Sequence, residues 1–128
     1  MSDIQRLFSP NKRFFILLSS YEIRMSHWII SAALWEAAPE RELLLLGDAW
    51  WSTERVVWHD DSTCVTTELR RYPGDVPAIQ IDIYPEQLSI VLHTPTGTVP
   101  LSFEGLDQYL ERYYQQRSRT SPASDQPR

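Results

Sequence analysis

Alternation of apolar residues with mostly polar ones marks the clearest elements of the chain. Every second residue is apolar in 79–83 and again in 88–92, and a turn-forming segment, 84–87, separates the two. A period of two is typical of a half-buried strand. Residues 95–97 (PTG) then turn the chain toward a third short segment, 98–101. The pattern predicts a three-stranded antiparallel meander.

The pattern changes to a helical spacing after this meander. Apolar side chains recur every three or four positions, at Phe103, Leu106, Leu110, Tyr113 and Tyr114, and the intervening positions are mostly polar. Ser102 is of the residue type that caps a helix N-terminus. We therefore expect an amphipathic helix over 102–116 that packs on one face of a sheet.

The first half of the chain is harder to interpret. Residues 13–18 favour a strand, and the apolar runs 28–36 and 42–48 favour a β-hairpin across a proline-containing turn. A helical hairpin stays open as the alternative, because alanine and leucine in these runs favour helix. Two further strands are expected, one ending at Trp58 and one over 63–69, which is rich in β-branched residues.

Together these elements predict an α+β fold: an antiparallel sheet of about five to seven strands with the C-terminal helix on one face. At 128 residues the chain has the length of one domain, which we assign to 13–116. Residues 1–12 are expected to be a flexible arm, although Ile4, Leu7 and Phe8 have helical spacing. Residues 117–128 lack large apolar side chains and are expected to form a disordered tail.

The most unusual feature of the composition is the set of five tryptophans between residues 28 and 58. Adjacent Trp50 and Trp51 would point to opposite faces of a strand, and one helix covers only one face of a small sheet. At least one of these rings is therefore expected on a second surface. Burial in the core is the commoner role of such rings, so both interpretations stay open.

The distribution of charge indicates which kinds of partner to expect, and the single cysteine indicates the cellular location. The net charge is −5, and residues 36–86 hold eleven acidic but only four basic residues. Because phosphate binding needs clustered Lys and Arg, we expect neither nucleic acid nor an anionic membrane as a partner, and favour a basic protein segment. No apolar run reaches the ~20 residues of a membrane span. The single cysteine favours a reducing, cytoplasmic location.

Catalytic and metal-binding signatures are absent from the sequence. His59, Asp60, Asp61 and Cys64 cluster, but without the paired spacing of metal ligands, so a charged turn is the simpler interpretation. Cys64 lies among β-branched residues, which favours a buried thiol over a nucleophile. No glycine-rich phosphate loop is present. We therefore expect no metal, no cofactor and no enzymatic activity.

The sequence thus predicts a protein-binding module, a small adaptor or assembly factor that captures a peptide segment in an aromatic groove with an acidic rim. An open sheet edge would add main-chain hydrogen bonds. The candidate partner-binding residues are Trp35, Trp50, Trp51, Trp58, Tyr109, Tyr113, Asp60 and Asp61. Two alternatives stay open: a toxin-neutralising immunity protein, and a small ligand-binding protein or enzyme that uses Asp82, His93 or His59 in a pocket.

Overall fold

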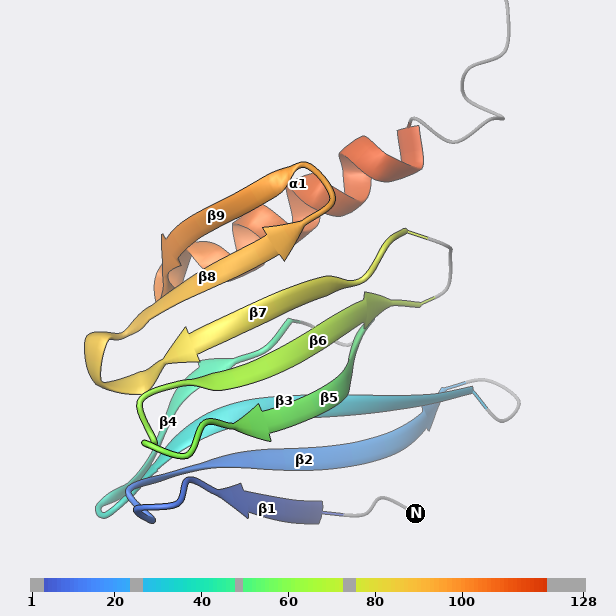
Figure 1. Cartoon of the computed structure of the whole chain (residues 1–128). Coiled ribbons are helices and arrows are strands. Elements are labelled where there is room, and N and C mark those ends of the chain that lie inside the picture. The colour runs from blue at the N-terminus through green and yellow to red at the C-terminus, as the bar shows by residue number, and fades with distance from the viewer. Residues whose placement is uncertain (1–3, 24–26, 48–49, 73–75, 120–128) are drawn as a thin grey trace, which may run out of the picture.

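A computed structural model describes residues 4–23, 27–47, 50–72 and 76–119 of the chain. The described residues form nine strands in two antiparallel sheets, followed by one C-terminal α-helix (Figure 1). The predicted α+β class and its C-terminal helix are therefore confirmed. The strand number differs from the expected five to seven because the first half of the chain forms a sheet of its own.

The first sheet, which we call sheet A, has the strand order β1-β2-β3-β4. Its strands are β1 (Ile4–Phe8), β2 (Phe14–Ile23), β3 (His27–Ala37) and β4 (Glu40–Leu45). The β3–β4 pair is the hairpin that the apolar runs favoured, and the helical alternative is wrong. The β-branched and aromatic residues of this region suit a strand, and Ala32, Leu34 and Leu44 pack in the core from β3 and β4.

Strand β1 corrects the expectation of a flexible arm over residues 1–12. Residues 4–8 pair with β2 along their whole length, from Ile4 opposite Ser19 to Phe8 opposite Phe15. The helical spacing of Ile4, Leu7 and Phe8 was misleading, since five residues are too few to form a stable helix without tertiary contacts. Leu7 instead packs against the core.

The second sheet, sheet B, is a five-stranded meander in the order β5-β6-β7-β8-β9. Its strands are β5 (Trp51–Trp58), β6 (Val65–Arg71), β7 (Ile79–Tyr84), β8 (Ser89–Thr94) and β9 (Gly97–Ser102). Its last three strands are the meander that the alternating pattern predicted. The turn after β7 is a short 3-10 helix, Pro85–Gln87, and Leu88 ends it with a left-handed backbone.

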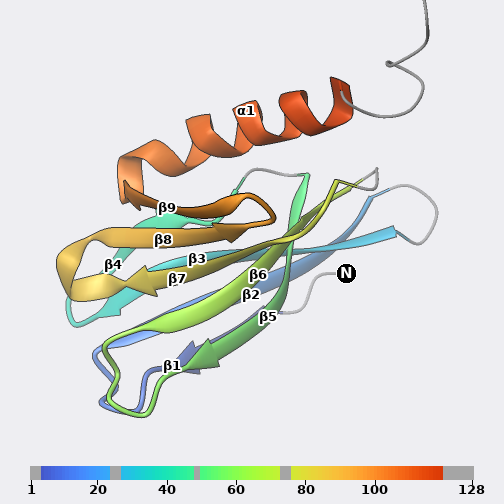
Figure 2. The same ribbon diagram turned by 45° about the horizontal axis from the view of Figure 1, so that its top comes forward.

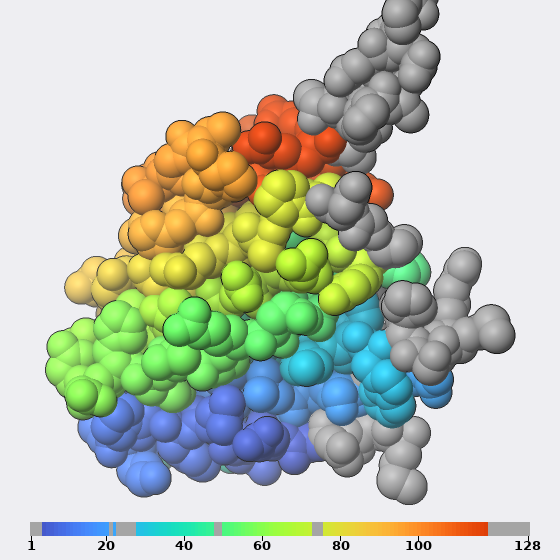
Figure 3. Space-filling model, turned by 45° about the vertical axis from the view of Figure 1, so that its right-hand side comes forward, coloured from blue at the N-terminus to red at the C-terminus, as the bar shows by residue number. Residues whose placement is uncertain are grey.

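The C-terminal helix begins later and ends later than the sequence predicted. Ser102 makes no side-chain capping bond, and a 3-10 turn over Phe103–Gly105 precedes α1 (Leu106–Arg119). Residues 117–119 of the predicted tail are therefore helical, and 120–128 lie outside the described residues. Figure 2 shows α1 beside β9 at the end of the molecule away from β1, and Figure 3 shows the same order in space-filling form.

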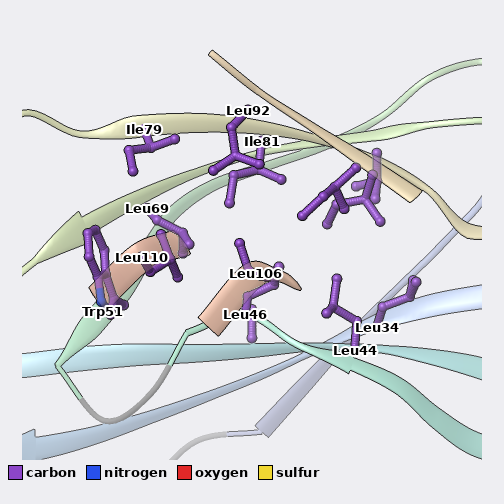
Figure 4. Close-up of a cluster of buried hydrophobic side chains, with 14 of the residues drawn as sticks. Leu34, Leu44, Leu46, Trp51, Leu69, Ile79, Ile81, Leu92, Leu106 and Leu110 are labelled. Atoms are coloured by element: carbon purple, nitrogen blue, oxygen red, sulfur yellow. The ribbon is translucent and has the colours of Figure 1, made fainter. Parts of the chain in front are cut away.

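One hydrophobic core is shared by both sheets and the helix. Trp51, Leu69 and the isoleucines of β7 meet Leu106 and Leu110 of α1, and Leu34 and Leu44 approach from sheet A (Figure 4). The alternation of β7 is confirmed, because its three isoleucines are fully buried. Tyr113, one turn beyond Leu110, completes the buried helix face.

Hydrogen bonds between described residues also join the two halves of the fold outside this core. The Trp58 indole Nε1 donates to the Leu7 carbonyl at 2.9 Å. The Asn11 backbone N–H donates to Ser62 Oγ, and the Ile30 backbone N–H donates to Ser52 Oγ, each at 3.0 Å. Both serines are buried, so these bonds satisfy polar groups that water does not reach.

Candidate functional site

Two hollows in the surface of the described residues lie along α1, one beside β4 and one beside Trp51 of β5. One hollow of about 220 Å³ lies between β4 and the start of the helix, and its lining consists of Leu43, Leu44, Leu45, Phe103, Glu104 and Asp107. A second hollow, of about 180 Å³, is lined by Trp51, Asp107, Leu110 and Glu111. Asp107 lines both hollows, and we call the two together the β4–α1 groove.

The helical repeat explains the acidic side of the groove. Glu104, Asp107 and Glu111 are spaced three and four residues apart, so they share one face of the helical segment. This face is adjacent to the one that buries Leu106 and Leu110 in the core. Among the described residues, the lining of the two hollows thus contains three carboxylates and neither lysine nor arginine. The groove combines an apolar floor with a negative rim.

Strand β4 forms the opposite wall and is an edge strand of sheet A. Among the described strands, β4 pairs only with β3, which occupies one of its two hydrogen-bonding edges. An edge strand presents unpaired N–H and C=O groups to which another extended segment can add. Main-chain recognition is therefore available along the same wall that supplies Leu43 and Leu45.

The size of the hollows indicates what they can hold. Small-molecule pockets typically measure roughly 300–1,000 Å³ and enclose most of the ligand. At about 180 and 220 Å³, each hollow is smaller than that range. Two small neighbouring depressions beside an edge strand suit individual side chains of an extended peptide better than one compact ligand.

Trp51, one of the candidate partner-binding residues, is a core residue. Its side chain is only 2% exposed, and the Arg71 guanidinium lies 5.9 Å from the centre of its ring. Arg71 also stacks on Tyr114 at 3.9 Å, which fixes the helix against β5 and β6. Gly47 leaves room for the ring, since a Cβ there would lie 2.6 Å from Trp51 Cβ. Trp51 contributes only the floor of the second hollow.

Trp58 and Tyr113, two further candidate partner-binding residues, make contacts within the fold. Trp58 is half-buried and ties β5 to β1 through its bond to Leu7. Tyr113 is buried, its hydroxyl donates to the Pro77 carbonyl at 3.1 Å, and burial raises the pKa of this phenol. Tyr109 stacks on Tyr113 with ring centres 6.3 Å apart and is half-buried. None of these three residues lines either hollow.

The other four predicted residues are at least partly exposed but do not converge. Trp50, in the turn that precedes β5, is 39% exposed, whereas Trp51 is buried. Because Trp50 does not lie in a strand, the alternation of strand faces does not explain its exposure. Asp60 and Asp61 are exposed in the turn after β5. Both the backbone and side chain of Thr63 donate to Asp61, and these bonds hold the pKa of that carboxyl below its usual range. Asp61 therefore stabilises its own turn.

Trp35 lies on the face of sheet A that does not contribute to the core. Phe8, Phe15 and Trp35 are directly opposite one another across β1, β2 and β3. Phe15 stacks on Trp35 with ring centres 6.0 Å apart and contacts Phe8 at 5.0 Å. The Trp35 Nε1 is buried and has no hydrogen-bond partner among the described residues. We call this side of the sheet the outer face of sheet A.

The residues of the enzyme alternative do come together, on the outer face of sheet B. Asp82 accepts from Thr66 Oγ1 at 2.7 Å and contacts His93 Nε2 at 2.8 Å. His59 Nε2 lies 2.9 Å from the same Thr66 hydroxyl. The chain of contacts therefore joins three strands of sheet B through polar side chains. It lies apart from the residues that line the β4–α1 groove.

Cys64 lies close to this polar chain but is buried. Desolvation raises the pKa of its thiol, and the negative charge of Asp82 raises it further. A thiol in this state is mostly protonated at neutral pH and is a poor nucleophile. Within the described ranges, no three His, Cys, Asp or Glu side chains are placed to hold a metal ion.

Sequence reasoning missed the residues that line the groove on its helix side. Asp107 and Glu111 are among the polar positions of the predicted helix, and both are exposed in the structure. Nothing in the helical pattern alone indicates that the edge strand β4 lies across from them. The carboxylates that line the two hollows come from the 3-10 turn and from α1, and neither Asp60 nor Asp61 lines them.

No helix in the described part of the chain has the length and apolar character needed to cross a bilayer. Comparison of the chain with protein-family models, with curated proteins and with solved structures found no match.

Proposed function

We propose that the protein is a non-enzymatic binding module that captures an extended, basic segment of another protein in the β4–α1 groove. The observation that carries the proposal is the composition of the groove lining, whose described residues are leucine, phenylalanine and tryptophan with three carboxylates and no cation. Apolar side chains supply contact area, and carboxylates favour a ligand that carries lysine or arginine.

The mode of binding follows from the wall that β4 forms. An extended segment adds to the open edge of β4 through main-chain hydrogen bonds, and its alternate side chains point toward α1. An apolar side chain enters the hollow between Leu43 and Phe103. Basic side chains reach Glu104, Asp107 and Glu111, which span about 10 Å of helix at 1.5 Å per residue. This rise matches three residues of an extended chain at about 3.3 Å each.

A random peptide library displayed on phage tests the proposal without a known partner. The full chain is immobilised, and enriched peptides are sequenced and then titrated against variants. We expect enrichment of peptides that combine basic with apolar residues. The charge-reversal variant Asp107→Lys is expected to weaken binding of the enriched peptides about fivefold to tenfold, as each rim pair is worth about 1 kcal/mol.

Matched variants separate this groove from the rim that the sequence predicted. Asp60→Lys reverses a charge of the same type in the turn after β5 and is expected to leave binding unchanged. A lysine at position 107 also interacts unfavourably with the dipole at the helix N-terminus and so lowers the stability of α1. Glu111→Lys, which lies farther from the N-terminus, therefore serves as a second groove variant. Peptides that bind wild type and both groove variants equally well would refute the proposal, as would a library that shows no enrichment.

A further inference from the structure

The outer face of sheet A is apolar although the rest of the described chain leaves much of it open. Phe15 and Ala33 are buried there only by their neighbours, while Phe8 and Leu45 are 40% and 45% exposed. None of these four residues belongs to the core cluster. Strand β2 has the sequence FFILL, with apolar side chains on both faces, a pattern typical of strands that are covered on both sides.

Two rows of side chains cross this face, and the strand register defines them. One row is Phe8, Phe15, Trp35 and Glu42, from β1 to β4. The other row is Arg6, Leu17, Ala33 and Leu45. Directly opposite residues of neighbouring strands point to the same side, so each row forms a continuous stripe.

Charge is distributed unequally between the two edges of the face. Lys12 lies over the Phe8 ring at 5.5 Å, and Arg6 lies over the Phe15 ring at 5.6 Å, which makes the β1 edge basic. Glu42, opposite Trp35, makes the β4 edge acidic. Within the described residues, neither Lys12 nor Glu42 takes part in an ion pair.

We propose that the outer face of sheet A binds a second copy of this chain and forms a two-fold symmetric dimer. A two-fold axis that runs along the strands, between β2 and β3, places β1 of one copy over β4 of the other. Lys12 and Phe8 then face Glu42 of the second copy, and Phe15 faces Trp35. In the other row Leu17 faces the small Ala33. In such an interface every contact occurs twice.

The extent of the face sets the expected strength of the dimer. Strands β1 to β4 have 5, 10, 11 and 6 residues. At about 3.3 Å per residue and 4.8 Å between strands, they cover roughly 500 Å² of flat area. Because protruding side chains make the surface uneven, its accessible area is larger than this flat area and approaches the ~800 Å² per partner of a standard interface. The dimer is therefore expected to dissociate in the micromolar range, about 1–100 µM.

Sedimentation velocity of the full chain over a range of concentrations tests this inference through a charge swap. The single variants Lys12→Glu and Glu42→Lys each place like charges opposite one another twice per dimer. Each is expected to weaken dimerisation at least about tenfold. The double variant, Lys12→Glu with Glu42→Lys, restores opposite charges and is expected to recover wild-type affinity within about threefold.

Two controls connect the result to this face. Arg112→Glu reverses an exposed charge on α1 and changes the net charge as Lys12→Glu does, so it is expected to leave dimerisation unchanged. Asp107→Lys, which tests the peptide groove, is expected to leave it unchanged as well. A chain that stays monomeric at every concentration would overturn the inference. Wild-type dimers that neither single variant weakens, or that the double variant fails to restore, would do so too.

Discussion

Replacing each of the adjacent tryptophans, Trp50 and Trp51, by alanine provides the sharpest test of how the indole rings are used. Trp51 is 2% exposed and packs against Arg71, whereas Trp50 is 39% exposed. Truncating a fully buried tryptophan to alanine typically costs about 3–5 kcal/mol, through lost burial and the cavity left behind. Truncating a surface residue usually changes stability by about 0.5 kcal/mol or less, and the partial burial of Trp50 raises its expected cost to about 1 kcal/mol.

Urea unfolding, followed by circular dichroism, measures the difference between the two variants. Domains of this size are stable by about 5–15 kcal/mol, so Trp51→Ala removes a large part of the total and lowers the midpoint strongly. Trp51→Phe keeps an aromatic ring in the site and is expected to cost less than Trp51→Ala. Equal costs for Trp50→Ala and Trp51→Ala, or a cost below about 1 kcal/mol for Trp51→Ala, would refute the assignment of Trp51 to the core.

Three further substitutions or reactions test other parts of the structure. Trp58→Phe removes the donor to the Leu7 carbonyl and is expected to cost about 1 kcal/mol in urea unfolding, with faster hydrogen exchange in β1; unchanged exchange would contradict the contact. Cys64 is expected to react with a disulfide reagent far more slowly in the native protein than in urea, and equal rates would show that it is accessible. The pKa of Tyr113 is higher in the folded state than its value of about 10 in the unfolded chain. The contribution of this phenol to stability is therefore complete below the unfolded pKa and is lost as the pH rises through the folded pKa. Tyr113→Phe is therefore expected to lose less stability than wild type between neutral pH and about pH 11, and an identical loss would contradict this linkage.

The elements with a strict period were predictable from the sequence, and those that depend on tertiary contacts were not. The alternation in 79–83 and the helical spacing of Leu106, Leu110 and Tyr113 specify which side is buried whatever packs against it. Strand β1 has no comparable pattern. Its place in sheet A depends on pairing with β2 and on the bond from Trp58, both distant in sequence.

The candidate site was predictable in its chemistry but not in its location. An acidic rim beside apolar side chains was expected, and the groove has this character. The expected rim at Asp60 and Asp61 was inferred from proximity to the tryptophans in sequence. The fold instead places α1 beside β4, a strand that lies about sixty residues earlier in the chain. The helix spacing identifies a charged face, and only the fold identifies what that face borders.

Mapping backbone amide shifts by NMR, as an enriched basic peptide is added to the full chain, tests the central claim most directly. The account predicts that the largest changes occur along β4 and over the first two turns of α1, with new protection of β4 amides from hydrogen exchange. Changes centred on the turn at Asp60 and Asp61, or on sheet B far from α1, would contradict it.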